Sequence, residues 1–124
     1  ETGKELGITI HPTGTVVVIN GPRFSTKAES KFFTSQGWEV INMTQFPEAY
    51  LVKEMDMCPL NISLITDYDA GLVGEVEPVS HAAVIKVFEE NNQKLKNLLF
   101  KMIEKLPVER ENCECEKTLS GSRV

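Results

Sequence analysis

The hydrophobic residues in the first third of the chain fall into short β-branched runs that alternate with a helix-like segment. Residues 15–20, Thr-Val-Val-Val-Ile-Asn, form one such run, and Gly21-Pro22 closes it. This predicts a buried strand followed by a sharp turn. Residues 26–29, Thr-Lys-Ala-Glu, have the spacing of a capping box, which predicts a helix that ends at Gly37. A second strand is expected over residues 38–43.

The same alternation continues through a further helix and a third strand. Pro47 and Glu48 suit a first helical turn, because proline needs no amide donor there and a carboxylate faces the positive end of the helix dipole. The helix is predicted to continue over residues 49–55. Residues 58–65 then predict a third strand, with Pro59 at its start. Strands that alternate with helices indicate an α/β fold with a largely buried sheet.

The second half of the chain contains a loop and then the clearest amphipathic segment. Between Asp67 and Val79 the pattern is broken by glycine and proline, which predicts a loop able to act as a lid. Ser80 is placed to cap a helix that ends before Pro107. Its apolar residues recur at steps of three and four, as expected for a face packed in a core: Val84, Val87, Phe88, Leu95, Leu98, Leu99, Met102 and Leu106. A polar tail follows over residues 107–124.

Composition narrows the class of protein. The 124 residues are 41% hydrophobic, which suits one globular unit, and 13 basic against 18 acidic residues give a net charge of −5. No basic stripe with interleaved aromatic residues is present, so nucleic acid is not an expected partner. No apolar run approaches the roughly 20 residues that cross a bilayer, so we expect no membrane insertion and a cytoplasmic location.

Polar residues and one phenylalanine lie at the ends of the three predicted strands. They are Arg23, Phe24 and Ser25 after the first, Asn42 and Thr44 around the second, and Thr66, Asp67 and Asp69 after the third. Ligands of open α/β sheets bind at the carboxyl ends of the strands, so one pocket is able to collect all three groups. Helix capping and turn formation are the alternative explanation for the same residues.

Two other chemistries fit the sequence poorly. Residues 67–75 do not match a calcium loop, which needs further oxygen ligands, a glycine and a closing glutamate at fixed positions. We therefore expect no metal site there. No serine lies in a Gly-x-Ser-x-Gly elbow, and His11 and His81 have no evident triad partners, so a nucleophilic hydrolase is not expected.

Three motifs, in order, resemble purine nucleoside phosphorylases, most closely the methylthioadenosine phosphorylase branch. They are Asn20-Gly21-Pro22-Arg23-Phe24-Ser25 followed by Ala28-Glu29-Ser30, then Val40-Ile41-Asn42-Met43-Thr44 with Pro47-Glu48, then Thr66-Asp67-Tyr68-Asp69. The resemblance covers residues 1–106. It implies the C-terminal half of the nucleoside phosphorylase fold, a mixed β-sheet flanked by helices, and residues 107–124 then form a polar tail with a Cys-x-Cys motif.

The resemblance implies a pentosyltransferase that splits methylthioadenosine with phosphate into adenine and a ribose 1-phosphate derivative. Asp67, and secondarily Asp69, take the catalytic role of facing the imidazole-side nitrogen and the exocyclic group of the leaving purine. Phe24 packs on the purine ring, Ser25 lies near its pyrimidine edge, and Thr44 bonds phosphate. The remaining implied substrate contacts are Asn42, Met43, His81 and Val84.

Three residues bear on the choice of substrate. Asp67 accepts from a 6-amino group, whereas relatives that cleave inosine and guanosine carry asparagine there and glutamate in place of Ser25. This favours 6-aminopurine nucleosides, because a mismatched buried polar pair costs roughly 1–3 kcal/mol. His81 points the other way, since the 6-oxopurine enzymes use a histidine to bond the 5′-hydroxyl. A 6-oxopurine nucleoside phosphorylase therefore stays open as an alternative.

The family's Gly-rich phosphate loop and its paired arginine and histidine have no match in this sequence. We therefore expect a fragment, a truncated gene product or one half of a two-chain enzyme, and a non-catalytic nucleoside-binding fragment is a further alternative. The family implies a homo-oligomer, a trimer or dimer of trimers, with inorganic phosphate as co-substrate and no cofactor. Cys113 and Cys115 leave redox tuning or metal capture open, beside the preferred interpretation of a tail without a role.

Overall fold

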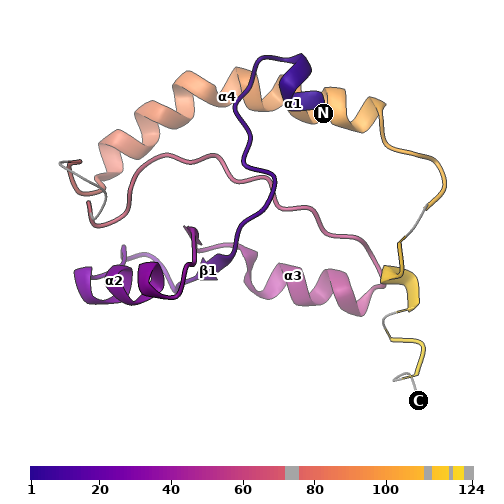
Figure 1. Ribbon diagram of the computed structural model, residues 1–124, viewed down its shortest axis with the longest axis horizontal. Helices are drawn as coiled ribbons and strands as arrows, with labels where there is room; N and C mark the ends of the chain where they lie inside the picture. The colour runs from indigo at the N-terminus through magenta and orange to yellow at the C-terminus, as the bar shows by residue number, and fades with distance from the viewer. Residues whose placement is uncertain (72–75, 111–112, 118, 122–124) are drawn as a thin grey trace.

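The computed structural model describes residues 1–71, 76–110, 113–117 and 119–121. The elements in these residues form two layers. Figure 1 shows α4 and α1 on one side and β1, α2 and α3 on the other, with extended chain running between them. The elements are α1 (Thr2–Glu5), β1 (Val16–Val18), α2 (Lys27–Ser35), β2 (Val40–Asn42), α3 (Gln45–Glu54), α4 (His81–Glu104) and the 3-10 helix η1 (Cys115–Lys117).

The sheet of the described residues is a parallel pair formed by the first two predicted strands. Val16 lies opposite Val40 and Val18 opposite Asn42, and the Ile19 N–H extends the pairing by donating to the Asn42 carbonyl at 3.0 Å. At the other end the Glu39 carboxylate accepts from the Thr15 N–H at 2.6 Å. Because parallel strands need a crossover, α2 connects them as a βαβ unit.

The start and end of α2 follow the predicted signals. The Thr26 hydroxyl accepts from the Glu29 N–H at 3.3 Å, and the Glu29 carboxylate accepts from the Thr26 N–H at 2.7 Å, so the capping box is formed. Arg23 donates two hydrogen bonds to the same carboxylate, at 2.7 and 2.8 Å. Gly37 ends the segment with φ of 71°, a conformation that glycine adopts without a Cβ clash.

The prediction of a third strand is wrong, because residues 58–65 form neither strand nor helix. Within the described part of the chain, no backbone–backbone hydrogen bond involves residues 58–66. A β-branched, apolar run becomes a strand only where a neighbouring strand offers its N–H and C=O groups, and the ladder described here ends with β1 and β2. The segment instead crosses the molecule as extended chain between the two layers (Figure 1).

The other helices confirm the periodicity and add one element. Pro47 lies in the first turn of α3, and Ser80 caps α4 by accepting from the Ala83 N–H at 3.3 Å. The short helix α1 was not predicted; it packs against α4, and Glu5 accepts from Lys105 at 2.6 Å. None of the helices in the described residues combines the length and hydrophobicity that a membrane crossing requires.

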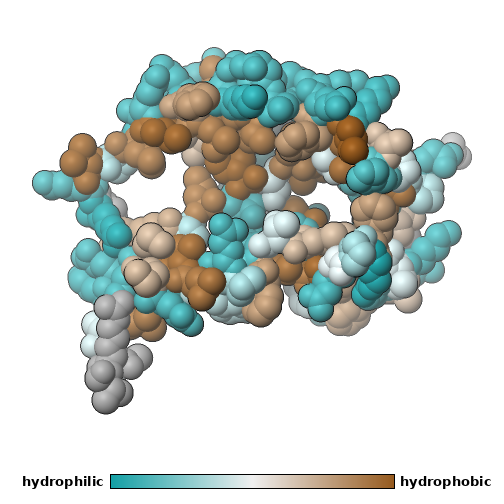
Figure 2. Space-filling model, turned by 180° about the vertical axis from the view of Figure 1, so that it is seen from behind, coloured by the Kyte–Doolittle hydropathy of each residue, from teal (hydrophilic) through white to brown (hydrophobic). Residues whose placement is uncertain are grey.

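The apolar residues are covered only in part by the chain described here. Ile19 and Leu98, with 8% and 5% exposure, are the buried hydrophobic residues of the described chain, whereas Phe88 and Leu99 on the apolar face of α4 remain 46% and 39% exposed. Figure 2 shows hydrophobic residues gathered along the inner side of the α4 layer, with openings between it and the other layer. The amphipathic face that the sequence predicts is present, and its packing partners are few.

The ion pair at the start of α2 predicts a pH-dependent stability. The Arg23 guanidinium, with help from the Thr26 N–H and hydroxyl, lowers the pKa of Glu29 from 4.5 to about 2. A lowered folded-state pKa stabilises the fold fully above pH 4.5, and this stabilisation is lost as the pH falls from 4.5 to about 2. The difference in melting temperature between the parent and Glu29→Gln should therefore be largest at neutral pH and shrink toward pH 2 in thermal unfolding. Glu89→Gln, an exposed change on α4, is the control, and a difference that does not vary with pH would contradict the assignment.

Candidate active site

The parallel pairing brings the segments that follow β1 and β2 to the same edge of the sheet. The Met43 sulphur lies 3.1 Å from the position that a Cβ on Gly21 would take. A side chain at residue 21 would therefore push Met43 away, and the glycine permits the close approach of the two segments. Phe24 follows in the first segment with 41% exposure.

The polar residues of these two segments differ in how the protein already uses them. Asn42 is engaged by Gln45, because its amide donates to Gln45 Oε1 at 3.3 Å and its carbonyl oxygen accepts from the Gln45 N–H at 3.4 Å. Thr44 precedes α3 but makes no side-chain capping bond, and it is exposed. The Ser25 hydroxyl is buried with no hydrogen-bond partner among the described residues. The hydroxyls of Thr44 and Ser25 are thus not used by the local fold.

The two aspartates after residue 65 are held by a connected set of hydrogen bonds. The Thr66 hydroxyl donates to Asp67 Oδ2 at 2.7 Å, and the Asp69 N–H donates to Asp67 Oδ1 at 2.9 Å. Asp69 itself has φ of 51°, a left-handed conformation that aspartate tolerates better than most residues. Its carbonyl accepts from the Val79 N–H at 2.8 Å. The Asp67 carboxylate is therefore fixed in orientation by donors on both oxygens.

Ser30 joins this segment to α2. It is the buried polar residue of the described chain, with 3% exposure, and its hydroxyl donates a short hydrogen bond to Asp69 Oδ2. Because α2 begins just after Ser25, this bond couples the segment that carries Phe24 and Ser25 to the segment that carries the aspartates. Sequence analysis gave Ser30 no role; the signal available was a small polar residue one turn into an otherwise capped helix.

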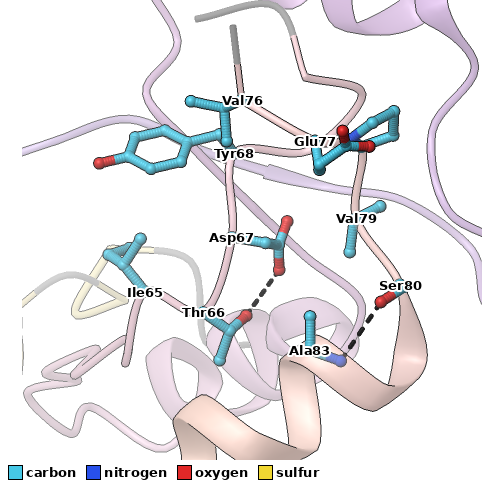
Figure 3. Close-up of a pocket in the computed structure, with 10 residues that line it drawn as sticks. Ile65, Thr66, Asp67, Tyr68, Val76, Glu77, Val79, Ser80 and Ala83 are labelled. Carbon is cyan, nitrogen blue, oxygen red and sulfur yellow. Dashed lines mark hydrogen bonds between the residues drawn. The ribbon is translucent and has the colours of Figure 1, made fainter.

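A pocket of about 360 Å³ opens beside the aspartates. Figure 3 shows the Asp67 carboxylate pointing from its own segment toward the segment of Val79 and Ser80, with the bonded Thr66 below it in this view. The volume lies at the lower end of the range for small-molecule sites, about 300–1,000 Å³. The lining combines apolar and polar residues: Ile65, Thr66, Asp67, Tyr68, Val76, Glu77, Pro78, Val79, Ser80 and Ala83.

One of the two predicted catalytic residues belongs to the pocket wall, and the other predicted site residues do not. Asp67 lines it, whereas Asp69 is turned toward Ser30. His81 is exposed at the first residue of α4, and Val84 is half-buried one turn later. The remaining predicted contacts are not part of the pocket wall: Phe24 and Ser25 follow β1, Asn42 is the last residue of β2, and Met43 and Thr44 follow β2. The predicted lid falls partly on residues 72–75, which lie outside the described residues.

Comparison with known proteins gives the same relationship as the three motifs. S-methyl-5′-thioadenosine phosphorylase of Pyrococcus abyssi is 48% identical over 119 residues, which is 96% of this chain and 44% of that protein. A probable 6-oxopurine nucleoside phosphorylase of Dictyoglomus turgidum is 42% identical over 123 residues, 99% of this chain and 45% of that protein. The chain thus spans less than half the length of these relatives.

Solved structures and a family model agree with the sequence relatives. Methylthioadenosine phosphorylase from Schistosoma mansoni in complex with adenine superimposes with a TM-score of 0.75 at 30% identity, over 86% of this chain and 37% of that one. This confirms the expected fold class, part of the α/β nucleoside phosphorylase fold. The model of the phosphorylase superfamily matches residues 1–104, and the chain therefore belongs to that superfamily.

Proposed function

We propose that this chain supplies the purine-binding and part of the ribose- and phosphate-binding site of a methylthioadenosine phosphorylase. The observation that carries the proposal is the Asp67 carboxylate, held by Thr66 and the Asp69 N–H at the wall of a pocket sized for a small molecule. The name of the 48% identical relative from Pyrococcus abyssi supports the substrate. The reaction converts methylthioadenosine and phosphate into adenine and methylthioribose 1-phosphate.

Asp67 acts on the leaving base in this proposal. Phosphate attacks the anomeric carbon as the bond from that carbon to the purine breaks, and the purine departs electron-rich. A proton held between a carboxyl oxygen of Asp67 and the imidazole-side nitrogen neutralises the base as it leaves. Each carboxylate oxygen has two acceptor positions, so the bonds from Thr66 and Asp69 leave capacity for the substrate.

The same carboxylate favours a 6-amino over a 6-oxo purine. An amino group donates to it, whereas a 6-oxo group presents a second oxygen against an oxygen. Because Thr66 and the Asp69 N–H fix both Asp67 oxygens, the carboxylate cannot turn away from the mismatch without losing a bond. A buried mismatched pair costs roughly 1–3 kcal/mol, which is about tenfold to over a hundredfold in selectivity.

The other predicted contacts complete the proposed site. Phe24 stacks on the purine, with Ser25 at its pyrimidine edge, and the free hydroxyl of Thr44 bonds phosphate.

The apolar face of α4 is proposed to be covered by the rest of the domain, which carries the phosphate loop. Two observations support this: the face is exposed, and the chain spans less than half the length of its relatives. A homo-oligomeric assembly and the use of phosphate without a cofactor belong to the proposal on the resemblance alone, and a cytoplasmic location stays a prediction from the sequence pattern. Asn42, Met43 and Val84 keep their proposed substrate contacts.

A 6-oxopurine nucleoside phosphorylase is the second candidate, and His81 is the observation that favours it. The side chain is exposed at the start of α4, directly after Ser80 of the pocket wall. An imidazole in this place is able to bond a 5′-hydroxyl, which methylthioadenosine lacks. The 42% identical relative from Dictyoglomus turgidum carries the corresponding name.

The first test of the proposal changes Asp67 in the assembled phosphorylase that contains this chain. Asp67→Asn should lower kcat/KM for methylthioadenosine by about tenfold to over a hundredfold, because an amide has a single acceptor oxygen and cannot both accept from the 6-amino group and share a carboxyl proton with the imidazole-side nitrogen. The loss for inosine should be smaller, so the ratio of the two specificity constants shifts. Glu77→Gln, a charge-neutralising change in the same pocket, is the control. Full activity of Asp67→Asn on methylthioadenosine would show that the role is misassigned.

A second test concerns the bond from Ser30 to Asp69. Ser30→Ala removes one hydrogen bond, worth roughly 0.5–1.5 kcal/mol, and frees Asp69 to turn. We expect kcat to fall about two- to tenfold with little change in KM, because the bond holds Asp69, whose N–H orients the Asp67 carboxylate proposed to act in the chemical step. Ser35→Ala, which removes a hydroxyl at the other end of α2, is the matched control. Equal changes in both variants would reduce Ser30 to a structural role.

The third test separates the two substrate classes through His81. His81→Val removes a hydrogen bond to a 5′-hydroxyl, so adenosine and inosine should lose about two- to tenfold in kcat/KM. Methylthioadenosine should hold or gain, because a polar group next to its methylthio substituent is replaced by an apolar one. Steady-state phosphorolysis of all three nucleosides gives the ratio, and an unchanged ratio would mean that His81 is not part of the 5′ subsite.

A further inference from the structure

The three cysteines of the chain converge at one place, away from the proposed active site. Their sulphur atoms all lie within 4.8 Å of one another, and the sulphurs of Cys58 and Cys113 are 2.9 Å apart. The Cys115 N–H also approaches the Cys113 sulphur, at 3.5 Å. Cys58 and Cys113 are 55 residues apart in sequence, so the fold, and not the local chain, brings them together.

Backbone and side-chain contacts that involve no sulphur hold both sides of this cluster. On one side α3 ends with Asp56 at φ of 53°, and the Asp56 and Met57 N–H groups donate to the Lys53 and Val52 carbonyls at 3.0 and 3.1 Å. This pattern is a Schellman motif, which fixes the direction in which the chain leaves toward Cys58. The cysteine therefore starts from a defined position.

The tail is anchored to the same place by Arg110. Its guanidinium donates to the Asp56 carbonyl at 3.0 Å and lies 3.9 Å from the Glu116 carboxylate in η1. Figure 1 shows η1 beside the C-terminal end of α3. These contacts place Cys113 and Cys115 next to Cys58 before any sulphur chemistry occurs.

We propose that Cys58, Cys113 and Cys115 form a three-thiolate site for Zn²⁺ that fastens the C-terminal tail to the end of α3. In a tetrahedral site, zinc–sulphur bonds of about 2.3 Å place the sulphurs about 3.8 Å apart. The 2.9 Å between the Cys58 and Cys113 sulphurs therefore lengthens by about 0.9 Å on binding, and no sulphur pair starts more than 4.8 Å apart. The donor set contains thiols alone, which selects a thiophilic ion over Mg²⁺ or Ca²⁺. A solvent molecule takes the fourth position.

The charge of the loaded site is compatible with its surroundings. Three thiols lose three protons as three zinc–sulphur bonds form, so Zn²⁺ and three thiolates carry a net charge of −1. The Arg110 guanidinium, anchored on the Asp56 carbonyl beside the cluster, is placed to offset that charge. No oxidant is required, since the sulphurs keep their oxidation state. The site is independent of the proposed catalytic function, because none of its residues lines the Asp67 pocket.

The test uses the purified protein that contains this chain, reduced, stripped of metal and titrated with Zn²⁺ and, as a spectroscopic probe, Co²⁺. We expect one Zn²⁺ per chain and thiolate-to-cobalt charge-transfer absorption. Cys58→Ser, Cys113→Ser and Cys115→Ser should each lower the zinc affinity by more than about tenfold, since even loss of an outer-shell partner costs about that much. Met57→Leu, next to Cys58 but without a ligand atom lost, should bind as the parent does.

A second readout follows the tail itself. Zinc should slow tryptic cleavage after Arg110 and Lys117 in the parent and in Met57→Leu, but not in Cys58→Ser, because only a ligand outside the tail makes the metal a fastening. Failure of the reduced protein to bind zinc, zinc binding that survives all three serine changes, or zinc protection of the tail in Cys58→Ser would each overturn the proposal. Phosphorolysis assays are not involved, so these outcomes are separate from a failure of the proposed function.

Discussion

The parallel register of β1 and β2 is the constraint on which the placement of the active-site segments depends. With Val18 opposite Asn42, both strands end at the same edge, and the chain after each strand is delivered there. Gly21 then lets the Met43 sulphur approach to within contact of the first segment. The purine-facing and ribose-facing groups of the proposed site therefore come from two segments whose relative position is set by backbone hydrogen bonds.

The aspartate segment is fixed differently, because it has no ladder to hold it. Its position rests on side-chain bonds: Thr66 and the Asp69 N–H to Asp67, and Ser30 to Asp69. Preorganised groups of this kind avoid reorganisation when charge develops on a leaving base. The arrangement explains why Ser30 is buried inside α2, since its hydroxyl connects this helix, which follows Phe24 and Ser25, to the aspartate segment proposed to act on the purine.

The sequence predicted correctly those features, such as helix starts and ends, that depend on interactions between residues close together in the chain. The Thr26 and Glu29 capping box, Gly37 at positive φ and the Ser80 cap all appear as expected, because each depends on residues within a few positions. The prediction of a strand over residues 58–65 was wrong for the opposite reason, because a strand there needs a neighbouring strand that the described residues do not provide. Two long-range contacts could not be predicted from periodicity or motif spacing either. Ser30 contacts Asp69, 39 residues away, and Cys58 contacts Cys113, 55 residues away. The motifs identified the family and named Asp67, and only the structure showed what orients it.

The central claim is that Asp67 contacts the purine base, and a crystal structure of the assembled phosphorylase with adenine and phosphate measures this directly. The account predicts an Asp67 carboxyl oxygen about 2.6–3.2 Å from the imidazole-side nitrogen or the exocyclic amine of adenine, with the Thr66 and Asp69 bonds to Asp67 kept. An adenine bound elsewhere, or bound with its amino group and imidazole edge more than about 4 Å from Asp67, beyond hydrogen-bond reach, would contradict it.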